Sequence, residues 1–214
     1  PSISFSFLDT KTSQRLSTPY YFNISEDKEL TFTPSFNYGG GVDSSQRFLF
    51  DYNQIISGGN LNFDLSVDTN LENQNNNKWI SEASLITNYN NKINEHFQLN
   101  LSSALQTSKY YIQTTNPYDE ISYKSSLSTS LTLTGYDLNK YDDKLLINTT
   151  TYQVTQQNED NKKIPTVLPF ISYFSGDNSY MDYNYNNTIN LYNIFRDIPT
   201  AIHAKNQQKI AHQL

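Results

Sequence analysis

Histidine and carboxylate side chains are the groups in this chain that could coordinate a metal or transfer a proton. The three histidines, His96, His203 and His212, have no second histidine at a ligand spacing, and the chain has no cysteine, so we expect no metal site and no disulfide. Three groups of carboxylates lie in predicted connections, where we expect them to be solvated, and none has the spacing of a calcium-binding loop. These groups are Glu26–Asp27–Glu29, Asp142–Asp143 and Glu159–Asp160.

Motifs for covalent chemistry and for nucleotide binding are also missing from the sequence. There is no nucleophile elbow, no glycine loop that could hold a phosphate and no dinucleotide fingerprint. The net charge of −6 disfavours a nucleic-acid partner, since such a partner is held largely by basic residues on its phosphates. We therefore predict a protein that is not an enzyme, uses no cofactor and binds no nucleic acid.

The composition fits strands that have one apolar face and one uncharged polar face. Only 36% of the 214 residues are hydrophobic and the mean hydropathy is −0.65, yet 17 tyrosines and 12 phenylalanines bring the aromatic fraction to 14%. Aliphatic residues are too few for a packed α/β core, and aromatic residues are too many for a disordered chain. No run of apolar residues is long enough for a transmembrane helix.

Apolar residues recur at every second position along most of the chain, which predicts strands. Several predicted strands have ten residues or more, whereas globular strands usually have about five or six and a tilted membrane-spanning strand needs about 9–11. We therefore predict an all-β fold, an antiparallel transmembrane β-barrel of which this chain supplies roughly 12 strands. The predicted strands are residues 2–8, 15–24, 29–38, 45–54, 61–71, 79–89, 96–107, 120–134, 144–155, 166–174, 180–195 and 204–214.

The predicted connections alternate between short turns and longer loops. The longer ones, Glu72–Lys78, Ser108–Asp119 and Gln156–Lys163, fall at every second connection. Bacterial barrels have this alternation, with short periplasmic turns and longer outside loops. No linker divides the chain, which starts and stops within strand patterns. We therefore predict that residues 1–214 are the N-terminal portion of one outer-membrane barrel domain, with no second domain.

The two faces of the predicted strands have different expected surroundings. Asp64 and Asp68 share a polar face, and we expect that face to line a wet lumen or the outside of a sandwich, because burying unpaired carboxylates is costly. Tyrosines near strand ends either form interfacial girdles or pack across strands. They are Tyr20, Tyr21, Tyr38, Tyr89, Tyr110, Tyr111, Tyr136 and Tyr152.

Prolines stand within or beside the first alternating segments, at Pro1, Pro19 and Pro34. Proline has no N–H to donate to a strand ladder, so paired strands usually exclude it. We expect each proline to weaken the pairing of its strand. The alternative interpretation is that Pro1 only begins a strand and that Pro19 lies at a bulge.

Three segments near the N-terminus have a distinctive order: residues 1–3 (PSI), 17–24 (STPYYFNI) and 29–34 (ELTFTP). In order and spacing they resemble the start of the barrel in the LptD (OstA, organic solvent tolerance) family of lipopolysaccharide-assembly proteins. Residues 164–171 (IPTVLPFI) resemble a later segment of that family more loosely.

The resemblance implies lipopolysaccharide (LPS) transport and assembly at the bacterial outer membrane, without a covalent step. The implied barrel receives LPS from a periplasmic Lpt bridge, holds an LptE-like plug lipoprotein, and releases LPS sideways among the outer-membrane lipids. The resemblance also implies that Pro1 and Pro19 are lateral-gate prolines on the first two strands.

Two other functions remain open from the sequence. One is a different outer-membrane barrel, such as a porin or a receptor, although the Pro-Tyr-Tyr order at residues 19–21 argues against it. The other is a soluble β-sandwich module that binds glycans. A sandwich would have shorter strands and an aliphatic two-sided core, and the predicted strand lengths disfavour it.

Overall fold

Antiparallel strands make up most of the structure, a computed structural model that describes residues 4–7, 14–38, 45–73, 78–116, 119–139, 142–156, 158–181, 183–196 and 210–213. This confirms the prediction of an antiparallel all-β fold. In that described part, no helix has the length and apolarity needed to cross a membrane.

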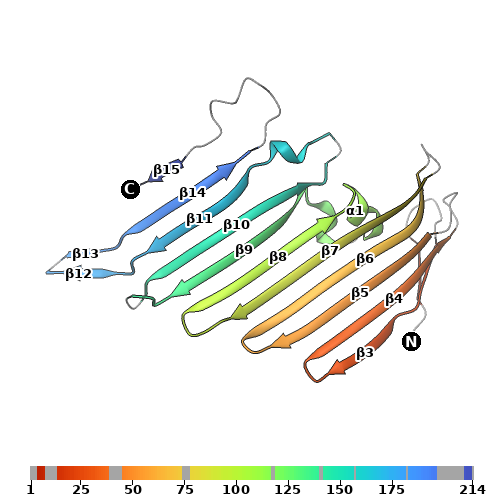
Figure 1. The fold of residues 1–214 in the computed structure, drawn as a ribbon, viewed down its shortest axis with the longest axis horizontal. Coiled ribbons are helices and arrows are strands. Elements are labelled where there is room, and N and C mark those ends of the chain that lie inside the picture. Colours follow the sequence, from red (N-terminus) through yellow and green to blue (C-terminus); the bar gives the residue numbers. More distant parts are fainter. Residues whose placement is uncertain are drawn as a thin grey trace. The chain divides into compact units, whose positions relative to one another are not determined.

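Neighbours in sequence are mostly neighbours in the sheet (Figure 1). A 13-stranded sheet has the order β1-β2-β4-β5-β6-β7-β8-β9-β10-β11-β14-β15, with β3 also paired to β4, and β12 and β13 form a separate pair. Closure of this sheet into a barrel stays a prediction. The strands are β1 (Ser4–Phe7), β2 (Gln14–Ser17), β3 (Tyr20–Ser25), β4 (Lys28–Tyr38), β5 (Ser45–Ile56), β6 (Gly59–Asn73), β7 (Lys78–Lys92), β8 (Phe97–Gln106), β9 (Ser126–Tyr136), β10 (Lys144–Val154), β11 (Thr166–Phe174), β12 (Asn178–Tyr180), β13 (Tyr183–Tyr185), β14 (Thr188–Phe195) and β15 (Ile210–Gln213).

Three predicted strands differ from the observed ones. The strand at 15–24 is divided into β2 and β3, with Thr18 and Pro19 between them. The strand predicted at 120–134 begins only at Ser126, the first residue of β9, because Glu120–Tyr123 form a 3-10 helix, η1. The side chain of Asp119 caps this helix by accepting a hydrogen bond from the amide of Ile121. The strand at 180–195 is divided between the β12–β13 hairpin and β14. The predicted strands 2–8 and 204–214 lie partly outside the described residues.

Short turns and longer connections alternate along much of the described chain. Two residues join β3 to β4, two join β5 to β6, and four join β7 to β8. Gly58, in the β5–β6 turn, has φ +94°, a backbone conformation that glycine adopts at little cost. The β8–β9 connection contains helix α1 (Tyr111–Thr115) and η1. The β11–β14 connection breaks the alternation, because it contains the β12–β13 hairpin.

The chain divides into two compact units, which are described in turn. Unit 1 comprises Pro1–Ile56, Leu61–Thr87 and Ala104–Lys124, and therefore contains β1–β5, most of β6 and β7, α1 and η1. Unit 2 comprises Ser57–Asn60, Asn88–Ser103 and Ser125–Leu214, and therefore contains β9–β15 and most of β8.

The strands of unit 1 place aromatic side chains on one face. Phe32 on β4 opposes Phe50 on β5, and their ring centroids are 4.9 Å apart. Tyr52 on β5 stacks with Phe63 on β6 at 5.0 Å. Because side chains alternate across a strand, the intervening residues form the other face, which is polar. The β4–β6 part of the sheet therefore has one aromatic and one polar face.

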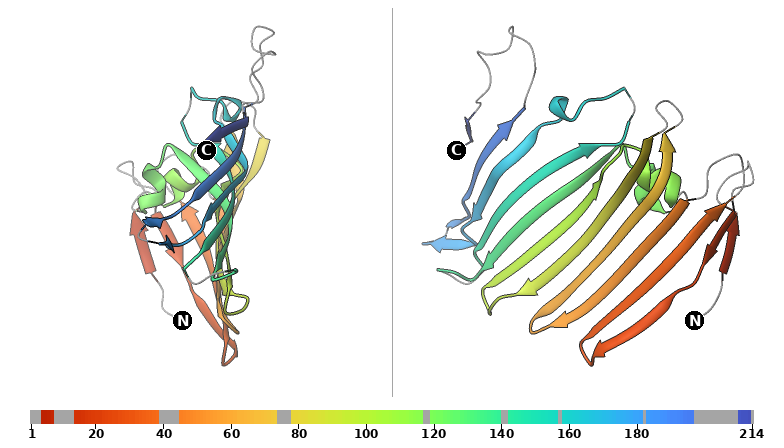
Figure 2. Two further views of the ribbon diagram at one scale, coloured as in Figure 1. Left: turned by 90° about the vertical axis from the view of Figure 1, so that its left-hand side faces the viewer. Right: turned by 45° about the vertical axis from the view of Figure 1, so that its right-hand side comes forward.

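The polar face of β4–β6 is the buried one. All described side chains of these strands that are buried are polar: Ser35, Ser45, Arg47, Ser66 and Asp68. The aromatic residues opposite them are half-buried or exposed, with Phe36 at 49% exposure. Figure 2 shows α1 and η1, in green, on one side of these strands, and the contacts given below place α1 on the polar side. Burial in this part of the sheet is thus the reverse of that in a soluble sandwich.

Unit 2 continues the alternation on β9–β11. Leu133 opposes Ile147, and Ile147 opposes Ile171, which gives an apolar row across three strands. On the other face the amide of Asn148 donates to the hydroxyl of Thr132 at 2.6 Å. The registers of β11 with both neighbours shift between Val167 and Phe170, where the Leu168–Pro169 peptide bond is cis.

Candidate functional site

The predicted gate proline Pro19 lies in the interruption between β2 and β3 and is half-buried. Pro1, the other predicted gate residue, lies outside the described residues. Ser17 opposes Ser35 on one side of the interruption, and Tyr20 opposes Phe32 on the other. From the first pair to the second, the chain advances three residues on one strand and goes back three residues on β4, so the register is continuous and no bulge is present at Pro19.

This continuous register brings Thr18 opposite Pro34 on β4. The amide of Thr18 donates to the carbonyl of Pro34 at 3.1 Å, and Pro34 has no N–H to donate in return. Backbone N–H groups alternate in direction along a strand, so the ring nitrogen of Pro19 faces away from β4, toward the side on which β2 pairs with β1. Pro34 and Pro19 therefore remove donors from opposite sides of the same interrupted strand.

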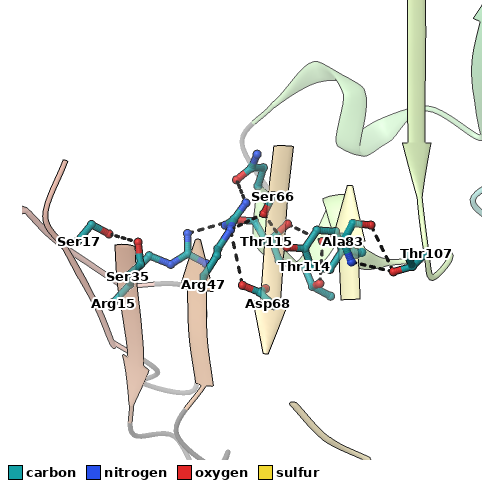
Figure 3. Close-up of polar contacts among 12 residues, drawn as sticks. Arg15, Ser17, Ser35, Arg47, Ser66, Asp68, Ala83, Thr107, Thr114 and Thr115 are labelled. Atoms are coloured by element: carbon teal, nitrogen blue, oxygen red, sulfur yellow. Dashed lines mark hydrogen bonds and ion pairs between the residues drawn. The ribbon is translucent and has the colours of Figure 1, made fainter. Parts of the chain in front are cut away.

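A second constellation lies where α1 meets the polar face of unit 1 (Figure 3). The Arg47 guanidinium donates three hydrogen bonds: Nε to the Ser66 hydroxyl at 2.8 Å, Nη1 to the carbonyl of Thr115 at 3.0 Å, and Nη2 to the side chain of Asn116 at 3.2 Å. Nη1 of Arg15 donates to the same Thr115 carbonyl at 3.4 Å. Arg47 thus joins β5 to β6 and to the C-terminal end of α1.

Arg47 also forms a buried ion pair with Asp68. Its Nε lies 3.8 Å from Oδ1 of Asp68, and the two side chains are 0% and 3% exposed. The expectation of a hydrated Asp68 was therefore wrong, because α1 and the arginines close that end of the polar face, whereas Asp64 on the same strand is exposed as predicted. Two buried charges are tolerated only when paired, so Arg47 and Asp68 must stay together.

Helix α1 is fixed to the sheet by Tyr111. The tyrosine is 1% exposed, and its hydroxyl lies 2.6 Å from the Ser66 hydroxyl. Burial raises the pKa of Tyr111 to about 12. The amide of Ile112 donates to the side chain of Gln106 at 3.0 Å, which fixes the start of the helix to the end of β8. Tyr111 is therefore not an interfacial girdle residue.

The other tyrosines and the acidic groups have mixed surroundings. Tyr20 and Tyr21 are 44% and 61% exposed, as either interpretation of these tyrosines allows. Asp143 is buried, contrary to the expectation of solvation, because its carboxylate accepts from the amides of Leu138 and Asn139 at 2.7 and 3.1 Å. It therefore organises the β9–β10 turn.

Metal ligands do not converge in the part of the chain that the structure describes. No group of three histidine, aspartate or glutamate side chains there could hold an ion. The ring Nδ1 of His96 lies 3.0 Å from the carbonyl of Tyr136. His203 and the side chain of His212 lie outside the described residues.

The ion pair of Arg47 with Asp68 and the helix α1 were not predicted from the sequence. A signal for the ion pair existed, since counting back from a two-residue turn at Ser57 and Gly58 places Arg47 opposite Asp68. A five-residue helix carries no usable periodicity, so α1 had no comparable signal.

No protein-family model matches the chain, and no curated protein matches it. The LptD-family resemblance stays a prediction.

Proposed function

We propose that this chain forms part of an outer-membrane β-barrel that delivers LPS to the outer leaflet through a lateral gate. The observation that carries the proposal is the reversed burial of β4–β6, whose buried side chains are polar. A soluble sheet buries its apolar face, whereas a barrel in a membrane turns that face to lipid and keeps the polar face for its lumen.

The exposed apolar residues support lipid contact. Phe22 and Ile24 on β3 are 49% and 56% exposed, and Phe36 on β4 is 49% exposed. Contiguous apolar surface of this kind is unfavourable in water. The lengths of β4–β8, which run from 10 to 15 residues, also suit tilted strands that cross a bilayer. A porin would share these features.

The proline pair favours an LPS transporter over a porin. LPS carries a sugar portion suited to a polar lumen and acyl chains suited to the bilayer, so its release requires neighbouring strands to separate. Each missing ladder bond removes about 1 kcal/mol of pairing free energy. Pro19 and Pro34 lower the number of donors around one strand near the N-terminal edge of the sheet. The resemblance of residues 17–24 and 29–34 to the LptD family points to the same location.

Conditional depletion in the native host tests the proposal. Newly made LPS is pulse-labelled, and its arrival at the cell surface is measured before and after depletion. We expect arrival to stop, and re-expression of the wild-type protein to restore it. Unchanged arrival in fully depleted cells would contradict the proposal. Diffusion of small solutes through the purified protein in liposomes, together with unchanged LPS arrival, would favour the porin.

A further inference from the structure

The β12–β13 hairpin of unit 2 forms a cavity that none of the preceding functions uses. The hairpin lies in the connection between β11 and β14 (Figure 1). The cavity is open to solvent, with most of its lining residues exposed, and its volume of about 410 Å³ is within the range of small-molecule sites. Its lining consists of Asp177, Asn178, Ser179, Asn184, Tyr185 and Asn186.

Hydrogen bonds within the connection hold the walls of this cavity. The amide of Asn186 donates to the Asp177 carboxylate at 3.2 Å, which ties the two ends of the hairpin together. The side chain of Asn178 and the backbone amide of Asn187 both donate to the Ser175 hydroxyl, at 3.1 and 2.9 Å. The strands pair Asn178 with Tyr185 and Ser179 with Asn184. These contacts fix the conformation of the connection that surrounds the cavity.

The lining has the chemistry of a sugar site. The side chain of Asn184 can both donate and accept, as can the Ser179 hydroxyl, and sugar hydroxyls also donate and accept. The Asn178 amide already donates to two groups of the same connection, so Asn178 offers its oxygen as an acceptor. The Tyr185 ring is 50% exposed, and the negative face of such a ring attracts the C–H bonds on the apolar face of a sugar ring. The cavity thus combines hydroxyl-binding groups with a stacking surface.

The charge of the lining residues favours a neutral sugar over an acidic one. Among the residues that the structure describes, no lysine or arginine lines the cavity, and Asp177 contributes a carboxylate. A ligand that carries phosphate or carboxylate would therefore be repelled. We infer that the cavity binds a neutral saccharide. The inference stands apart from the proposed transport function, because it depends only on the hairpin.

Saturation-transfer NMR on the purified protein, in a detergent without a sugar headgroup, tests the site. The probes are glucose, galactose and N-acetylglucosamine, with glucose 6-phosphate as the charged comparison. We expect at least one neutral sugar to receive saturation from the protein. Because of Asp177, glucose 6-phosphate should bind several-fold more weakly than glucose. Absence of transfer to all three neutral sugars would overturn the inference.

Variants of the hairpin assign the signal to this cavity. Tyr185→Ala should weaken binding about tenfold through loss of the stacking ring, and Tyr185→Phe should retain it. The matched control is Tyr183→Ala, since Tyr183 is 75% exposed on the same strand and does not line the cavity. Equal binding by the wild type and Tyr185→Ala would overturn the site. Sugar binding without LPS delivery in cells would instead overturn the proposed function and leave the site standing.

Discussion

The amide of Thr18 donates to the carbonyl of Pro34 at 3.1 Å, and Pro34 cannot return the bond. At this point an antiparallel pair would normally exchange two hydrogen bonds. Pro19, the next residue, has no donor for the other side of the strand. The chain therefore keeps its register from Ser17 to Tyr20 with fewer bonds than the register allows. This is the physical basis for a strand that separates from its neighbours at low cost.

Replacing Pro34 tests that basis. In Pro34→Ala the new N–H can donate to the Thr18 carbonyl, a gain of about 1 kcal/mol that is partly offset by a more flexible unfolded chain. We expect slower amide hydrogen exchange along β3, measured by mass spectrometry. Pro165→Ala, outside the strands, is the matched control. Unchanged exchange in β3 of Pro34→Ala would show that the missing donor does not weaken the pairing.

Removal of Arg47 should strongly destabilise the protein. Arg47→Ala removes the ion-pair partner of the buried Asp68 and leaves only the more distant charge of Arg15 to balance it, so we expect a loss of up to about 3–5 kcal/mol in the free energy of unfolding. A urea titration in detergent measures the loss. Adding Asp68→Asn to Arg47→Ala should recover part of it, because the buried charge is then gone. Lys163→Ala, in an exposed ion pair with Glu159, should cost less than about 1 kcal/mol. Equal losses in the two single variants would contradict the buried-pair account.

Tyr111 should make the protein less stable as the pH rises through the alkaline range. Its pKa in the folded protein is about 12, above its ordinary value of 10.0, so the folded state holds the proton more tightly. The contribution is complete below pH 10 and declines as the pH rises from 10 to 12, by at most about 3 kcal/mol. The free energy of unfolding should therefore fall over this range, and it should fall less in Tyr111→Phe. Parallel pH profiles for the two proteins would refute this role.

Gly59 should tolerate no side chain. A Cβ atom there would lie 1.8 Å from the backbone carbonyl oxygen of Asn90, which cannot move without shifting β7. Gly59→Ala should cost at least about 1–3 kcal/mol and reduce the folded yield in detergent. Gly135→Ala is the control, because its Cβ would meet side-chain atoms of Leu138 and Phe97 at 3.0 and 3.1 Å, and these can adjust. A smaller loss for Gly59→Ala than for Gly135→Ala would contradict this packing.

Much of the sheet could be predicted from alternation and turns. The alternation around Phe63 and the glycine turn at Gly58 are local signals, and the strands they predicted are observed. Whether one face of a strand is buried depends on residues that are distant in the sequence. Asp64 and Asp68 have the same pattern in the sequence, yet only Asp68 is buried, because α1 folds onto its end of the strand. The division at Pro19 also required the partner strand, since the register with β4 decides which donor is lost.

The neighbouring residues Thr31 and Phe32 give the most direct test of the transport account. They lie on opposite faces of β4, near its short turn, so they should face the lumen and the inner-leaflet lipid respectively. A photoreactive amino acid is placed at each position in living cells, and the lipid adducts are identified after irradiation. We expect LPS on residue 31 and phospholipid on residue 32, with the LPS adduct lost when LPS delivery is arrested. Absence of LPS from residue 31, or equal LPS capture at both positions, would contradict it.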